Sequence, residues 1–217
     1  MTTPLDLWRQ RVDAGSLNPD PDQERAAAAL SALSGRLEGW KPGAKTLFGK
    51  TKPVPRGLYL WGGVGRGKSM LMDLFIETAP VASRRRAHFH EFMQGAHARI
   101  NRWRSLSKAD RRRQPEYVKG AGEDPIPPVA RSLASEARLL AFDEFHVTDI
   151  ADAMILGRLF EHLFAEGVVI VATSNRHPDD LYRDGINRQL FLPFIDLLKD
   201  RLDVMELDGG VDHRLRQ

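Results

Sequence analysis

The stretch GLYLWGGVGRGKSMLMDLF, residues 57–75, decides the fold. Its first five residues form a short uncharged run, which predicts a buried strand over residues 57–61. Glycines at four of the next six positions predict a tight turn. Apolar side chains such as Leu71 and Phe75 then indicate a helix over residues 67–79. A strand that leads through a turn into a helix is typical of α/β proteins.

Strands and helices alternate along the rest of the chain. Further strands are predicted at 87–92, 139–142, 168–173 and 203–207, and further helices at 95–105, 127–138, 149–167, 178–183 and 189–199, with a polar loop at 107–124. Two helices come first, one between Thr3 and Gly15 and one over residues 22–37, followed by a loop at 41–55. We therefore expect a central parallel sheet with helices on both faces, preceded by an N-terminal helical segment.

The glycine turn matches a phosphate-binding pattern. Its residues are Gly62, Gly63, Val64, Gly65, Arg66, Gly67, Lys68 and Ser69. Glycines let successive backbone N–H groups point inward at phosphate oxygens, and the following helix directs its positive end at the same place. In this pattern Lys68 reaches the outer phosphates and the Ser69 hydroxyl binds Mg²⁺. The alternative is a glycine turn that matches by chance, but the strand before it and the helix after it favour a nucleotide site.

Two carboxylates follow the buried run at residues 139–142. Asp143 is placed at the carboxyl edge of the sheet, where a carboxylate holds the Mg²⁺ of a bound nucleotide. Glu144 is the candidate general base that polarises the attacking water. An acidic turn without a catalytic role is the alternative.

A polar pair, Ser174 and Asn175, ends the apolar strand predicted at 168–173. Asn175 matches the position of the sensor residue in AAA+ ATPases, where an amide contacts the attacking water or the γ-phosphate. The alternative for Asn175 is a turn-capping role, which is common for this residue type.

Five stretches in order resemble one family, the AFG-like ATPases, which include a bacterial ATPase of the division ring and mitochondrial homologues. They are residues 57–75, HFHEFM at 88–93, LLAFDEFHVTDIADAMILGRLFEHLF at 139–164, VVIVATSN at 168–175 and a run from residue 178 onward. The resemblance covers residues 5–217. It implies a P-loop NTPase of the AAA+ type, a three-layer sandwich with sheet order 5-1-4-3-2, in which residues 51–217 form the core and residues 1–50 the helical segment.

The same resemblance implies an arginine finger, which in such folds comes from a neighbouring subunit and stabilises transition-state charge. Arg188 is the first candidate and Arg183 the second, with solvated helix-end charges as the alternative for both. It further implies ATP and Mg²⁺ as cofactors, an ATP-dependent homo-oligomer, and a protein partner from division-ring or protease-type machinery. The family continues beyond residue 217, so we expect this chain to lack the helical lid.

Charge is concentrated in one segment of the chain. The net charge of the whole sequence is +3, whereas residues 84–113 contain ten basic and two acidic residues and carry +8. A solvated basic face is the simplest interpretation. An acidic protein or an anionic membrane surface is the next, and nucleic acid is less favoured although Phe92 and Trp103 lie within the segment.

Two other features bear on chemistry. His88 and His90 would share one face of the strand predicted at 87–92, where such a pair more often packs than binds a metal. His146 either lines the site or belongs to a loop. The chain has no cysteine, which excludes disulfides and thiolate chemistry.

These observations together predict an Mg²⁺-dependent ATPase that performs conformational work on a protein partner. The family resemblance implies that this work belongs to cell division or protein quality control. A helicase-loader-like ATPase that handles nucleic acid and a nucleotide-binding adaptor without turnover are the alternatives. The absence of an apolar signal or spanning run favours the cytoplasm, with at most a peripheral place at the membrane.

Overall fold

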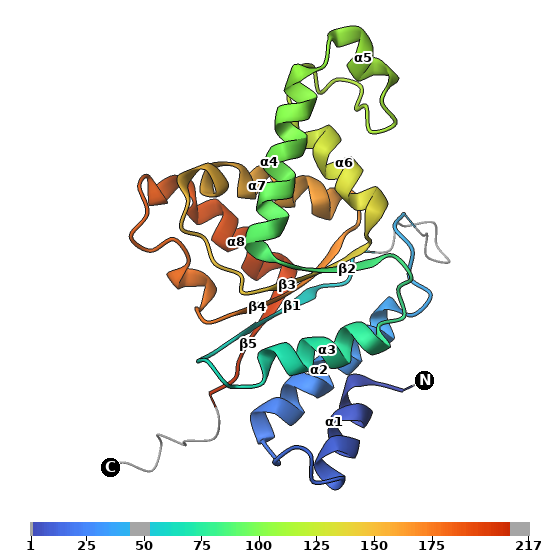
Figure 1. Ribbon diagram of the computed structural model, residues 1–217, viewed down its shortest axis with the longest axis vertical. Coiled ribbons are helices and arrows are strands. Elements are labelled where there is room, and N and C mark those ends of the chain that lie inside the picture. The colour runs from blue at the N-terminus through green and yellow to red at the C-terminus, as the bar shows by residue number, and fades with distance from the viewer. Residues whose placement is uncertain (1, 44–52, 209–217) are drawn as a thin grey trace.

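The computed structural model describes residues 2–43 and 53–208 and contains a parallel sheet of five strands (Figure 1). The strands are β1 Gly57–Trp61, β2 Arg84–His88, β3 Leu139–Asp143, β4 Val169–Ser174 and β5 Leu202–Glu206. Their order across the sheet is β2-β3-β4-β1-β5, which is the order that the resemblance implies, read from the other edge. The prediction of an α/β core with a parallel sheet is confirmed.

Helices cover both faces of the sheet (Figure 1). They are α1 Pro4–Asp13, α2 Pro21–Leu37, α3 Lys68–Thr78, α4 Phe89–Ser105, α5 Lys108–Arg113, α6 Ile126–Glu136, α7 Ile150–Ala165 and α8 Leu192–Arg201, with short 3₁₀ turns η1 Pro178–Asp180 and η2 Arg188–Leu190. Successive side chains of a strand point to opposite faces. Leu58 and Leu60 therefore pack in one core with α1, α2 and α3, whereas Tyr59 packs in the other with α4, α6, α7 and α8.

The central strands explain the apolar runs of the sequence. Every residue of β3 and β4 is buried, because each strand has a strand on both sides and helices on both faces. The edge strand β2 is only half-buried and carries three consecutive arginines, Arg84, Arg85 and Arg86. Charged residues are tolerated at an edge, where long side chains reach water or a partner.

The prediction of a strand at residues 87–92 is wrong. The strand ends at His88, and Phe89 begins helix α4, so the helix predicted at 95–105 starts six residues earlier. Apolar residues with helical spacing stabilise the first turns of α4, since Phe89, Phe92 and Met93 are all buried on one face of the helix. The sequence pattern did not indicate a strand at residues 84–88, because three consecutive arginines are atypical of a strand in a parallel sheet.

Smaller differences lie in the connections. The loop predicted at 107–124 contains helix α5, and the helix predicted at 178–183 is reduced to the 3₁₀ turn η1. The loop predicted at 41–55 and the end of the family-like run after residue 208 lie largely outside the described residues. In the part of the chain that the structure describes, every helix is too short or too polar to cross a bilayer.

Candidate active site

The glycine turn connects β1 to α3 and requires glycine at two positions in particular. Gly62 has a φ of 150°, and a Cβ atom there would lie 2.4 Å from the backbone oxygen of Leu207. Gly67 has a φ of 84° and stands at the N-cap of α3. Only glycine adopts such backbone without strain. The turn thus brings the chain back tightly to the N-terminus of α3, where backbone N–H groups have no helical partner and suit an anion.

Lys68 is held by the turn itself. Its Nζ donates to the backbone oxygens of Gly62 at 2.7 Å and Gly63 at 2.6 Å. Partial burial, followed by the charge of Arg66, lowers the pKa of Lys68 below its ordinary value. An ammonium group has a further N–H to donate, so Lys68 can meet a phosphate oxygen from this position.

The N-terminal helices reach the same turn. Trp8 Nε1 of α1 donates to Gln23 Oε1 of α2 at 3.2 Å, and Gln23 Nε2 donates to the backbone oxygen of Arg66 at 3.2 Å. The sequence gives no local signal for this link, because Gln23 and Arg66 are 43 positions apart along the chain. Gln23 therefore supports the turn from outside the sheet.

Asp143 ends β3 and is buried, but it is already paired. Arg86 of β2 donates from Nε to Asp143 Oδ2 at 2.6 Å and from Nη2 to Asp143 Oδ1 at 3.2 Å. The same guanidinium bonds the carboxylate of Asp73 in α3 and lies 3.4 Å from the backbone oxygen of Ser69. Sequence reasoning counted Arg86 only as part of a basic segment and missed this role. One side chain thus joins the two residues that the sequence proposes as metal ligands, Ser69 and Asp143.

Glu144 stands in a strained turn. Its φ is 55°, a left-handed conformation that is uncommon outside glycine. The next residue, Phe145, is buried, and its N–H donates to the backbone oxygen of Thr173 at 2.7 Å. Because the chain must turn sharply between β3 and this fixed point, Glu144 projects into solvent, with its side chain 80% exposed. Its Oε2 lies 4.0 Å from His88 Nδ1 at the end of β2.

The end of β4 lies beside the turn. Gly62 N–H donates to the backbone oxygen of Ser174 at 3.2 Å, and the buried Ser174 hydroxyl donates to the backbone oxygen of Phe145 at 2.7 Å. These bonds fix the point from which Asn175 emerges, exposed, at the carboxyl edge of the sheet. β4 therefore carries Asn175 to the mouth of the glycine turn.

A cavity of about 460 Å³ unites most of these residues. Residues 64–70 form one wall, and Glu144 with residues 173–175 forms the other. This volume is in the range of small-molecule sites. Asp143 does not line the cavity, and its carboxylate is paired with Arg86. The arrangement places phosphate-binding groups opposite a carboxylate and an amide, which suits attack of water on a bound phosphate.

A second cavity of about 510 Å³ adjoins the first and shares Glu144, Ser174 and Asn175 with it. His90 and His146 line it, and burial together with the charge of Arg176 lowers the pKa of His146. His146 is therefore part of the wall next to the site. It lies in the loop between β3 and α7 and does not line the cavity at the glycine turn.

The two candidate arginine fingers lie away from the first cavity. Arg188 Nη2 donates to the backbone oxygens of Asp179 at 2.5 Å and Leu181 at 3.5 Å. Arg183 is exposed and pairs with Asp180 at 3.3 Å. Neither residue lines the cavity at the glycine turn of its own chain.

His88 and His90 do not share a strand face, so that prediction is wrong. His88 ends β2, whereas His90 belongs to α4 and bonds Gln94 at 3.0 Å. Helix α4 starts between them, so the two residues belong to different elements. Among the described residues, no group of three or more His, Cys, Asp or Glu is placed to hold a metal ion.

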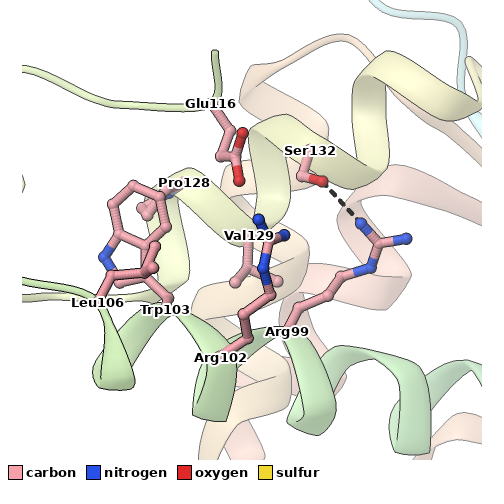
Figure 2. A pocket seen from close by; sticks show the side chains of 8 residues that line it. All are labelled: Arg99, Arg102, Trp103, Leu106, Glu116, Pro128, Val129 and Ser132. Atoms are coloured by element: carbon pink, nitrogen blue, oxygen red, sulfur yellow. Dashed lines mark hydrogen bonds between the residues drawn. The ribbon is translucent and has the colours of Figure 1, made fainter. Parts of the chain in front are cut away.

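The basic segment is divided among three elements. Its inner arginines have structural partners, as Figure 2 shows for Arg99 of α4, which donates to Ser132 Oγ of α6 at 2.7 Å. Phe92 and Trp103 are buried, 1% and 4% exposed, so neither can stack on a base. Most of the segment's exposed cations lie where α4 and α5 project from the body of the molecule (Figure 1), although Arg84 at the start of β2 is exposed as well. They include Arg102, Arg104, Lys108, Arg112 and Arg113.

Comparison with known proteins gives concordant results. The family model described as AFG1-like ATPase matches residues 2–217. The chain is 41% identical to the cell division protein ZapE of Escherichia coli K12 over 99% of this chain and 56% of that protein. It is 48% identical to Lactation elevated protein 1 homolog B of Danio rerio over 75% of this chain and 31% of that protein. The chain thus spans about half the length, or less, of these curated relatives.

Solved structures share the fold. DnaI matches with a TM-score of 0.56 at 14% identity, covering 88% of each chain. AMPPCP-bound DnaA from Aquifex aeolicus matches with a TM-score of 0.53 at 15% identity, covering 88% of this chain and 49% of that one. At these identities the likeness shows the fold alone, and that fold is the P-loop ATPase fold of the AAA+ type.

Proposed function

This chain belongs to the AFG1-like ATPase family, and from that premise we propose that it binds ATP with Mg²⁺ and hydrolyses it. The observation that supports this most is the cavity where residues 64–70 face Glu144 and Asn175. Phosphoryl transfer depends on positioning and charge stabilisation rather than on covalent catalysis by the protein. A cavity with phosphate donors on one wall and a carboxylate on the other meets that need.

The proposed roles follow from the positions of the side chains. The turn amides and Lys68 bind the phosphates, and the Ser69 hydroxyl and the Asp143 carboxylate would hold Mg²⁺. The bound metal would neutralise part of the phosphate charge. Glu144 accepts a proton from the attacking water and Asn175 orients that water, because both emerge at the carboxyl edge of the sheet.

The substitution Glu144→Gln tests hydrolysis. It keeps the size of the side chain and removes the base, so ATP binding is expected to persist while turnover falls by about 100-fold or more. Released phosphate and fluorescent-nucleotide binding measure the two effects. Asp184→Asn removes an exposed carboxylate that does not line the cavity at the glycine turn and serves as a control. Equal background rates for wild type and Glu144→Gln would instead favour the nucleotide-binding adaptor.

We propose that turnover drives conformational work on a protein partner in the cytoplasm. The Escherichia coli relative is named a cell division protein, which supports a division-related role ahead of protein quality control for this chain. Assembly into an ATP-dependent homo-oligomer completes the site, since Arg188 and Arg183 lie outside the cavity of their own chain. A peripheral place at the membrane belongs to the same proposal.

The exposed cations at the ends of α4 and α5 favour one alternative function, that of an ATPase that handles nucleic acid. Phosphate contacts of this kind weaken steeply with salt. Single-stranded DNA is expected to leave ATP turnover unchanged, because the aromatic residues of the segment are buried. Salt-sensitive stimulation of turnover by such DNA would favour the alternative.

A further inference from the structure

Arg86 occupies the carboxylate that the proposed metal site needs. Its Nε and Nη2 contact both oxygens of Asp143, at 2.6 and 3.2 Å, in a forked geometry that a guanidinium matches well. The pair is sheltered, since the side chains are 28% and 11% exposed. The hydrogen bond to Asp143 is the main cause that raises the pKa of Arg86, so Arg86 remains a cation. A fixed positive charge thus lies against Asp143.

Arg86 is also shared between two carboxylates. Its Nη1 contacts Asp73, which is on α3 and 57% exposed, while the Asp143 pair is on β3. Through Nη2 it lies against the backbone oxygen of Ser69. The guanidinium therefore has an alternative anchor at Asp73 if its hold on Asp143 loosens.

We infer that Arg86 competes with the divalent cation for Asp143 and so sets the Mg²⁺ concentration at which the nucleotide site fills. The inference rests on the proposed function, because it concerns the same metal site. A cation that approaches Asp143 meets a carboxylate whose charge is already neutralised, and two like charges around one carboxylate repel. Asp73 favours filling because it attracts Arg86 toward α3. Arg86 is thus a positioning residue that acts through Asp143.

The test measures Mg²⁺ dependence of binding rather than turnover. A fluorescent non-hydrolysable ATP analogue is titrated with Mg²⁺, and Mn²⁺ binding in the presence of the same analogue is followed by electron paramagnetic resonance. For Arg86→Gln the half-saturating metal concentration is expected to fall by about threefold or more. Arg85→Gln removes a charge from the same strand, where Arg85 faces Glu136 at 3.8 Å, and is expected to leave it unchanged.

Asp73→Asn is expected to have the opposite effect. It leaves Arg86 with Asp143 alone, so the half-saturating metal concentration should rise by about threefold. Asp73 is exposed on α3, so this variant tests the inference even if Arg86→Gln does not fold. If both variants fold, Asp73→Asn should have a smaller effect in the Arg86→Gln background, because the residue it acts through is missing.

The outcomes separate the two proposals. Wild-type protein that binds the analogue without any dependence on Mg²⁺ would contradict the metal site itself. If the wild type does depend on Mg²⁺, two results would overturn the role of Arg86 alone. One is a half-saturating metal concentration that is unchanged or higher in Arg86→Gln. The other is a concentration that is unchanged or lower in Asp73→Asn.

Discussion

Gly62 shows at the scale of one residue how the fold constrains the site. Its N–H bonds the end of β4, and a side chain at this position would collide with the backbone oxygen of Leu207 after β5. The residue thus lies where three strands of the sheet converge. A glycine in a phosphate-binding pattern is usually explained by the ligand. In this protein the packing against Leu207 already requires a glycine at position 62.

Gly62→Ala is therefore expected to destabilise the protein without any nucleotide. The positive φ and the contact with backbone, which cannot yield like a flexible side chain, should lower the free energy of unfolding by at least about 2 kcal/mol. Gly63→Ala is the matched control, since its Cβ would meet only Arg66 Cγ at 4.0 Å, and its effect should stay within about 0.5 kcal/mol. Urea unfolding measures both. Equal stability of the two variants would contradict this account of the turn.

At the scale of elements, helix α7 is the clearest case of a boundary that the sequence specifies. The Asp149 side chain accepts a hydrogen bond from Ala151 N–H at 2.6 Å and caps the helix at the start of the predicted range 149–167. The cap also ends the loop that carries Glu144 and His146. The stability of α7 and the position of that loop are therefore linked.

Asp149→Ala is expected to cost about 1 kcal/mol of stability, because it leaves a helix N–H without its acceptor. Asp149→Asn retains an acceptor oxygen and should cost clearly less. The midpoint of urea unfolding reports both values. A loss in Asp149→Asn as large as that in Asp149→Ala would assign the effect to charge instead of to capping.

Local pattern predicts some elements and misses others for a physical reason. β1, the glycine turn and α3 follow from neighbouring residues, and the structure places them as expected. β2 was misplaced because its stability comes from pairing with β3, more than fifty positions away, rather than from its own arginines. The pair between Arg86 and Asp143 depends on that same pairing. Spacing along the chain therefore predicts the turn, Glu144 and Asn175 but not Arg86.

At the scale of the whole molecule, the carboxyl ends of the strands gather the proposed site at one edge of the sheet. Each chain supplies one wall of donors and one of acceptors, but Arg188 lies elsewhere. We propose that the arginine that completes the site comes from a neighbouring copy. This part of the proposal concerns assembly, and mixed assemblies can test it.

Mixing two inactive variants is expected to restore turnover. Lys68→Ala removes a phosphate ligand and Arg188→Ala removes the proposed finger, so a mixed oligomer contains sites with both residues intact. Arg183→Ala in place of Arg188→Ala is the comparison, because Arg183 is exposed and pairs only locally with Asp180. Size-exclusion chromatography with ATP establishes that the variants assemble together. Co-assembly without recovery of activity would contradict a finger at Arg188.

The most direct test of the central claim is the affinity of the Lys68→Ala variant for ATP, measured by isothermal titration calorimetry in Mg²⁺. Lys68 lies between the turn oxygens and the cavity, so its removal should weaken ATP binding by about tenfold or more, which is about 1.4 kcal/mol. Lys108→Ala, at the exposed start of α5, should bind as the wild type does. ATP affinity that is the same in Lys68→Ala and in wild type would contradict the placement of the triphosphate at this turn.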